Sequence, residues 1–194
     1  GGEANGEQAA LLCAQTLHQC SSDEPFDALD FFRRANVAVC DMIAASGQVS
    51  GSTAATVHLT GNHAYCCNVG DSRAYRVGAE RLERITRDHS VVEGLIESGS
   101  ITAEQARTHP NRNLITRALG PEEHIECDVY DVTLGADERL LLCSDGLVVT
   151  ATDEEMYEAV GRGDTPEESL EHLLELSKQR GAPDNVTAVL LYQE

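Results

Sequence analysis

Long apolar segments and basic residues are both scarce in this sequence of 194 residues. No run approaches the roughly 18 apolar residues of a membrane-spanning helix, and no signal peptide opens the chain. Only 14 Lys and Arg residues stand against 33 Asp and Glu residues, for a formal net charge of −19. Nucleic acids and anionic membranes both bind basic surfaces, so we expect neither as a partner.

Paired cysteine motifs are also missing. The seven cysteines are an odd number and include no CxxC pair, which disfavours both a disulfide framework and a structural zinc site. Cys66, Cys67 and Cys143 lie in apolar segments, where a free thiol packs as a small hydrophobic group. These features predict a reducing, cytoplasmic environment. The GxSxG, P-loop and GxGxxG motifs of other enzyme classes are absent as well.

What is present is the composition of one globular domain, which we expect to span residues 1–194, with 41% hydrophobic residues. Two amphipathic helices are predicted first. The capping-box pattern Asn5-Gly6-Glu7-Gln8 opens one, and the other extends from about Asp27 to Gly47. Alternation of apolar and polar residues then predicts strands at 55–59, 65–69, 73–77 and 81–85, with a hairpin turn at Gly61-Asn62.

The second half of the chain continues this mixture. Capping boxes at Ser90 and Thr102 predict short helices in a small insertion, and those at Thr152 and Thr165 predict two longer helices after Asp145. Strands are predicted at 125–132, 138–143 and 186–192. Helices and strands do not alternate as βαβ units, so the pattern favours an α+β fold, an antiparallel β-sandwich with helix pairs on its outer faces.

Three aspartates adjoin predicted strands. Asp145 follows the apolar run Leu140–Cys143, Asp184 precedes the last strand, and Asp88 follows the strand that ends near Ile85. If those strand ends are neighbours, the carboxylates converge, and such a cluster needs cations to stay ionised. Oxygen ligands alone predict Mg²⁺ or Mn²⁺. Each aspartate is equally compatible with an ordinary turn or helix cap.

Two histidines, His89 and His109, flank the insertion. Either could transfer protons in a catalytic site, but histidines at the surface or satisfied by structural hydrogen bonds are commoner. We therefore assign no catalytic side chain from the sequence.

A series of short motifs, in order along nearly the whole chain, carries a resemblance to a known family. The motifs are Gly1-Gly2 with Gly6-Glu7, Gly51-Ser52-Thr53, Asn68-Val69-Gly70-Asp71-Ser72-Arg73, Thr86-Arg87-Asp88-His89-Ser90, Gly99-Ser100-Ile101-Thr102, His109-Pro110-Asn111-Arg112-Asn113, Thr116-Arg117-Ala118-Leu119-Gly120, Cys143-Ser144-Asp145-Gly146-Leu147 and Asp184-Asn185-Val186-Thr187. With them the chain resembles a bacterial member of the PP2C-type (PPM) metal-dependent protein serine/threonine phosphatases.

The resemblance implies a fold and a metal centre. The fold is a four-layer αββα sandwich, in which two antiparallel β-sheets are flanked by pairs of antiparallel helices, with a small helical flap at residues 90–113. Asp145 and Asp184 would be ligands of a two-metal centre that holds Mn²⁺ or Mg²⁺. Asp88 would be a ligand of a third metal, so that two or three ions bind.

The implied reaction is hydrolysis of phosphoserine and phosphothreonine in phosphoproteins, by attack of a metal-bridging hydroxide and without a phosphoenzyme. A cognate Ser/Thr kinase is an expected partner. The same chemistry in a phosphatase that controls a sigma-factor switch is a variant of this hypothesis.

Departures from the family pattern motivate an alternative. The family's phosphate-binding Arg, Glu-Asp pair and Asp-Gly precede the double glycine, so they and the first strands of the sandwich are missing from this chain, and we expect them in a segment before Gly1. Glu3 stands where relatives usually have His, and Val149 at a position that is often acidic or polar. The alternative is a catalytically inactive PP2C-like domain that acts as a binding or regulatory module.

Overall fold

The computed structural model describes residues 5–22 and 26–192, and the contacts divide them into two compact units. The described residues of the first unit are 5–22, 26–58, 67–70 and 88–129. Those of the second unit are 59–66, 71–87 and 130–192. Each unit has its own hydrophobic core. The expected single domain over 1–194 stays a prediction.

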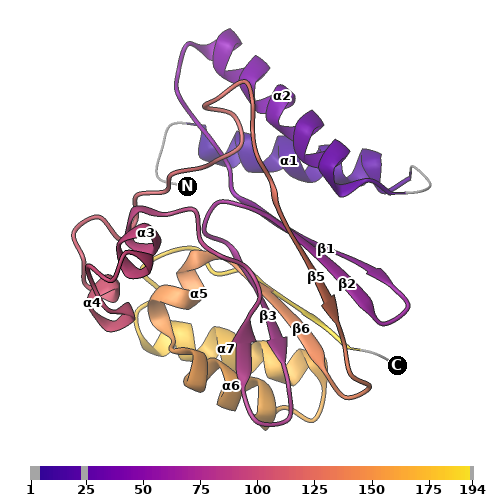
Figure 1. Ribbon diagram of the computed structural model, residues 1–194, viewed down its shortest axis with the longest axis vertical. Helices are drawn as coiled ribbons and strands as arrows, with labels where there is room; N and C mark the ends of the chain where they lie inside the picture. Colours follow the sequence, from indigo (N-terminus) through magenta and orange to yellow (C-terminus); the bar gives the residue numbers. More distant parts are fainter. Residues whose placement is uncertain (1–4, 23–25, 193–194) are drawn as a thin grey trace. The chain divides into compact units, whose positions relative to one another are not determined.

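Two helices that pack against each other, α1 (Gly6–Cys20) and α2 (Ala28–Ser46), build much of the first unit (Figure 1). The Asp27 side chain caps α2 by accepting the N–H groups of Leu29 and Asp30, and Gly47 ends it in a left-handed conformation. Both ends of α2 were thus predicted correctly. The predicted capping box of α1 is wrong, because Asn5 adopts a left-handed conformation and its side chain makes no cap hydrogen bond.

The core of the first unit lies between these helices and the strand and loop residues of the same unit. Its members are all nearly inaccessible to solvent. They are Ala9, Cys13, Cys20, Phe31, Phe32, Ala35, Val39, Cys67, Val69 and Leu119.

A three-stranded sheet contains β1 (Ala54–Thr60), β2 (His63–Val69) and β5 (Asp128–Thr133) in the order β1-β2-β5. Each strand contributes residues to both units. The turn at Gly61-Asn62 separates β1 from β2 as predicted. The strand predicted at 125–132 begins only at Asp128, since Ile125 and Cys127 pack against the core of the first unit instead.

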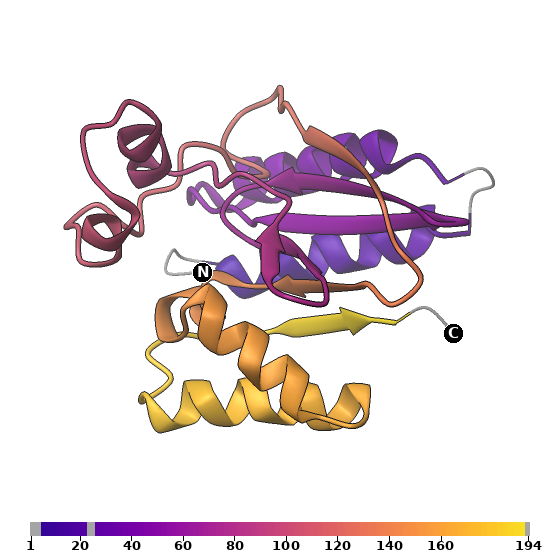
Figure 2. The ribbon, with the colours of Figure 1, turned by 60° about the horizontal axis from the view of Figure 1, so that its bottom comes forward.

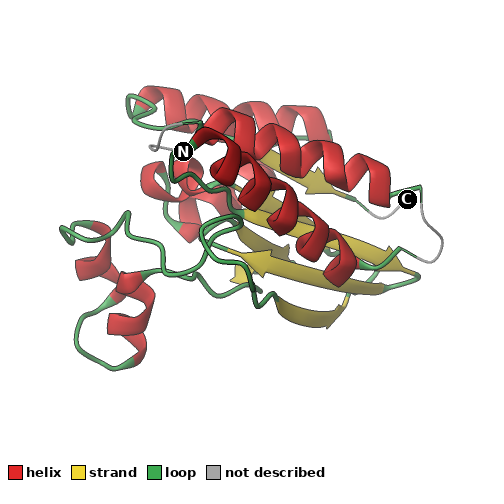
Figure 3. Ribbon diagram, turned by 90° about the horizontal axis from the view of Figure 1, so that it is seen from above, coloured by secondary structure: helices red, strands yellow, loops and turns green. Residues whose placement is uncertain are grey.

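The predicted helical insertion contains two short helices, α3 (Val91–Glu97) and α4 (Ala103–Arg107), which contact each other (Figure 3). The Ser90 side chain accepts the N–H of Glu93, and Thr102 with Gln105 forms a complete capping box. The local fold of this segment therefore follows the sequence, while its role as a flap stays a prediction.

The second unit contains a four-stranded antiparallel sheet with the order β4-β3-β6-β7. Its strands are β3 (Arg73–Val77), β4 (Leu82–Arg84), β6 (Arg139–Cys143) and β7 (Ala188–Leu191). Cys143, at the end of β6, pairs with Ala188, at the start of β7. This register brings the residues after β6 beside those before β7.

Three helices cover this sheet: α5 (Asp145–Thr150), α6 (Asp153–Arg162) and α7 (Pro166–Gln179). Helix α7 contacts α5, α6 and β7 (Figure 2). The core between sheet and helices is formed by buried side chains that include Tyr75, Leu141, Leu147, Met156, Val160 and Leu173. The two antiparallel sheets and their helices make this an α+β fold, as predicted. No helix in the described part of the chain is long and apolar enough to cross a membrane.

Candidate metal centre

The end of β6 is fastened to the segment before β7 by Ser144. Ser144 is the N-cap residue of α5, yet its hydroxyl does not cap the helix. The hydroxyl instead donates to the carbonyl of Asn185 over 3.2 Å and accepts the N–H of Thr187 over 3.0 Å. A backbone hydrogen bond from Ser144 N–H to the Thr187 carbonyl, 3.0 Å long, adds to this connection.

Gly146 allows the same two segments to approach closely. A Cβ atom at position 146 would lie 2.3 Å from the carbonyl oxygen of Asn185, far inside a normal contact. Only a residue without a side chain fits between α5 and this backbone.

Asp145 and Asp184 flank the fastened junction, so the structure brings two of the three predicted ligands together. Burial raises the pKa of Asp145, and the negative charge of Asp184 raises it further. Asp184 is exposed, and one of its oxygens accepts the N–H of Asn185 over 2.8 Å. Among the described residues, no Lys or Arg side chain forms an ion pair with either carboxylate.

This pair of carboxylates fits a hard divalent cation. Mg²⁺ binds through one or two carboxylates and keeps several water ligands, and Mn²⁺ favours the same oxygen donors. A cation would also offset the repulsion between the two aspartates. In the described part of the chain no three His, Cys, Asp or Glu side chains form a complete metal-binding group, so the pair would depend on further ligands.

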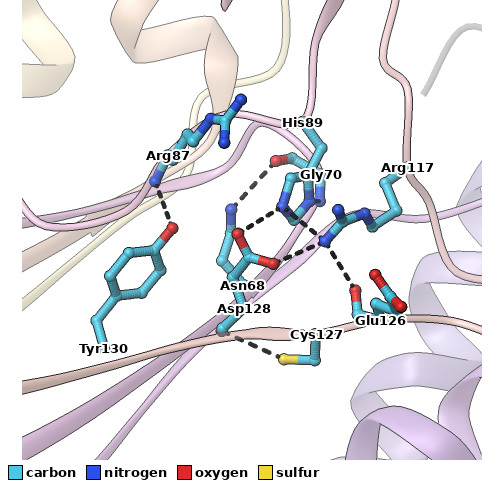
Figure 4. A network of polar contacts seen from close by, with 9 residues as sticks. All are labelled: Asn68, Gly70, Arg87, His89, Arg117, Glu126, Cys127, Asp128 and Tyr130. Carbon is cyan, nitrogen blue, oxygen red and sulfur yellow. Dashed lines mark hydrogen bonds and ion pairs between the residues drawn. The ribbon is translucent and has the colours of Figure 1, made fainter. Parts of the chain in front are cut away.

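Asp88 belongs to the first unit, where it is 7% exposed. The adjacent His89 is equally buried, and its Nε2 atom lies 3.2 Å from Oδ2 of Asp128 (Figure 4). The other oxygen of Asp128 accepts a hydrogen bond of 2.7 Å from Nη1 of Arg117. Burial alone would raise the pKa of Asp128, but the hydrogen bonds from His89 and Arg117 hold it below its usual value.

The sequence indicates only part of this cluster. Arg117 was noted only as a motif residue, and nothing around Asp128 suggested a role, because a single acidic residue at the start of a strand is common.

Val149, in α5, is 43% exposed. Gly1, Gly2 and Glu3 lie outside the described residues.

Comparison with known proteins shows the family to which this chain belongs. A family model described as Protein phosphatase 2C matches residues 2–95. The crystal structure of the PPM Ser-Thr phosphatase MsPP from Mycobacterium smegmatis, in complex with cacodylate, superimposes with a TM-score of 0.90 at 34% identity, covering 98% of this chain and 84% of that one. The chain belongs to the PP2C family.

One further relative and a solved structure of its catalytic domain support the PP2C assignment. The serine/threonine protein phosphatase PstP of Mycobacterium tuberculosis is 37% identical over 199 residues, which cover 98% of this chain but only 38% of PstP. This chain thus spans about two fifths of that curated relative. The catalytic domain of PstP, solved in complex with two manganese ions, superimposes with a TM-score of 0.84 at 34% identity, covering 98% of this chain and 82% of that one.

Proposed function

We propose that this PP2C chain is the catalytic part of a metal-dependent phosphatase that hydrolyses phosphoserine and phosphothreonine in proteins. The observation that carries the proposal is the pair Asp145 and Asp184, held together by Ser144 without an ion-pair partner from any described Lys or Arg. Family membership and the manganese-bound PstP domain support the same conclusion.

Asp145 and Asp184 would hold the divalent cations of the catalytic centre, Mn²⁺ or Mg²⁺, and Asp88 would bind a third. Bound divalent cations lower the pKa of a coordinated water and neutralise charge on a phosphoryl group. The chain itself carries a net charge of −19, which would repel an anionic phosphate ester, so a cation also makes substrate binding possible.

The chain's own residues fix the geometry of this centre. Ser144 holds the end of β6 against the 184–187 segment, and Gly146 keeps α5 close to Asn185. Neither feature supplies a nucleophile, in agreement with a reaction that needs no covalent intermediate on a side chain. Phosphoproteins produced by a cognate Ser/Thr kinase in the cytoplasm are the substrates we propose.

The test is hydrolysis of a phosphothreonine peptide and of p-nitrophenyl phosphate by the protein with Mn²⁺, with Mg²⁺ and with EDTA. We expect activity only with a divalent cation, and a loss of about 100-fold or more in Asp145→Asn and Asp184→Asn. Asp164→Asn is the matched control, because Asp164 is an exposed aspartate between α6 and α7.

Activity that survives EDTA, or full activity of Asp145→Asn, would contradict the proposal. A folded protein that binds phosphopeptide but shows no hydrolysis with either cation would instead support the non-catalytic binding module.

A further inference from the structure

The two ring nitrogens of His89 have different partners. The backbone N–H of Gly70 points to Nδ1 at 3.0 Å, and a backbone N–H can only donate. Nδ1 is therefore the acceptor, and the hydrogen-bond network assigns the proton of the neutral ring to Nε2, which faces Asp128 (Figure 4). The imidazole is held at both ends.

His89 engages Gly70 through its backbone as well. The carbonyl of Gly70 accepts the N–H of His89 over 2.9 Å and the side-chain amide of Asn68 over 3.1 Å. Gly70 has a φ of 107°, and a Cβ atom there would lie 2.3 Å from Cγ2 of Thr53, so no other residue fits this turn. His89 is thus joined to a turn whose conformation cannot readily change.

The backbone around His89 also connects the two ends of the 90–113 segment. The carbonyl of His89 accepts the N–H of Thr116 over 2.7 Å, and the carbonyl of Leu114 accepts the N–H of Val91 over 2.9 Å. Ser90 and Ile115 form an isolated antiparallel bridge between them. The chain therefore enters and leaves the α3–α4 segment along one short ladder, beside Asp88.

Asp128 connects His89 to Arg117. Nη1 of Arg117 binds Oδ1 of Asp128 and, over 3.1 Å, the carbonyl of Glu126. The same Nη1 lies 3.1 Å from Nε2 of His89. With the proton on Nε2 these two nitrogens are both donors, so the carboxylate that accepts from both holds them together.

We propose that His89 is a positioning residue: held between Gly70 and Asp128, it fixes the adjacent Asp88 and locks the two ends of the 90–113 segment to the Gly70 turn. The part that concerns Asp88 rests on the proposed function, since it takes Asp88 as a ligand of a divalent cation. The part that concerns the 90–113 segment depends only on the hydrogen bonds described above.

The first measurement is Mn²⁺ binding, followed by the electron paramagnetic resonance signal of free Mn²⁺. We expect Asp88→Asn to remove the weakest Mn²⁺ site, and His89→Ala to weaken that site about 10-fold, as for residues that orient a metal ligand. His89→Asn should recover part of the affinity, because its Oδ1 atom can replace Nδ1 as the acceptor of Gly70 N–H. His124→Ala is the control, since His124 is exposed in the same unit.

The second measurement is amide hydrogen exchange in the metal-free protein. We expect His89→Ala to accelerate exchange at Gly70, Val91 and Thr116 by about 10-fold or more, with no comparable change at the β6 amides of the second unit. Partial recovery in His89→Asn should be greatest at Gly70.

Each result supports or contradicts a separate part of the inference. If Asp88→Asn binds Mn²⁺ like the unmodified protein, the ligand role of Asp88 is wrong, and the proposed function loses its third metal. If Asp88→Asn loses a site but His89→Ala does not, His89 does not position Asp88. If His89→Ala accelerates exchange evenly in both units, or nowhere, the lock on the 90–113 segment is refuted.

Discussion

Asp145 and Asp128 both lie next to a β-strand, but their surroundings are opposite. Asp145 follows β6, and burial together with the charge of Asp184 raises its pKa. Asp128 begins β5, and His89 and Arg117 hold its pKa below the usual value in spite of burial. His89 and Arg117 thus balance the charge of Asp128, whereas no described Lys or Arg side chain forms an ion pair with Asp145.

The difference matches what is expected of a carboxylate that binds a cation and of one that orients neighbouring side chains. A carboxylate that is to hold a cation must not be neutralised by a neighbouring Arg or Lys, so its site is destabilising until the cation arrives. A carboxylate that orients other groups works best with every hydrogen bond satisfied. We therefore expect substitutions at the two sites to change stability in opposite directions, whereas disruption of the backbone at either one should simply destabilise the fold.

The largest effect should come from the backbone contact at Asp145. Gly146→Ala places a Cβ atom 2.3 Å from the Asn185 carbonyl, and this overpacking should lower the free energy of unfolding by about 1–3 kcal/mol. Urea denaturation with and without Mn²⁺ measures the change. Gly161→Ala is the control, because a Cβ there meets no atom within 4 Å and alanine favours the helix. Equal stability of Gly146→Ala and the unmodified protein would show that the two segments separate easily.

Removing the charge of Asp128 or of Asp145, with the protein in EDTA, tests whether the two carboxylates affect stability in opposite directions. Asp128→Asn should lower the free energy of unfolding by about 1–2 kcal/mol, because Arg117 and His89 lose a charged acceptor. Asp145→Asn should raise it by about 0.5–1 kcal/mol, because the repulsion from Asp184 disappears. Added Mn²⁺ should then stabilise the unmodified protein more than it stabilises Asp145→Asn. Changes of the same sign in EDTA would mean that the two carboxylates do not differ as described.

Much of the fold could be predicted because its signals are local. The caps at Asp27, Thr102 and Thr152 mark helix starts that the structure confirms. Helix α5 was missed, since Gly146, Val148, Val149 and Thr150 all have low helix propensity and the helix depends on burial of Leu147 in the core. Local pattern cannot predict an element that tertiary packing imposes.

The Asp145–Asp184 pair and the cluster around Asp128 also differ in how far the sequence could predict them. The apolar runs before Asp145 and after Asp184 predict two strands, and the carboxylates were expected to converge if those strands are neighbours. The pairing of Cys143 with Ala188 shows that they are neighbours. The cluster around His89 joins the turn after β2, the start of β5 and the ends of the insertion, so no spacing in the sequence could indicate it. The metal ligands themselves stay a prediction.

The smallest expected change in stability concerns a third carboxylate, Glu155 of α6. Arg180 balances its charge, but the pair is partly exposed to solvent. Hydrogen bonds from Arg180 and from the N–H of Thr152 lower the pKa of Glu155 to about 2 from an ordinary value of 4.5. The folded state thus favours ionised Glu155, so the stabilisation is complete above pH 4.5 and is lost as the pH falls towards 2.

Arg180→Gln should therefore destabilise the protein at pH 7, but only slightly, because solvent screens this partly exposed pair. The destabilisation should become progressively smaller between pH 4.5 and 2, as Glu155 is protonated. The Thr152 hydrogen bond remains in the variant, so part of the pKa shift should persist. Urea denaturation at pH 7 and pH 3, with Arg162→Gln in the exposed pair Arg162–Glu158 as control, measures the difference. A destabilisation that is larger at pH 3 than at pH 7 would have the wrong sign for a matched carboxylate, and Glu155 would then resemble Asp145 rather than Asp128.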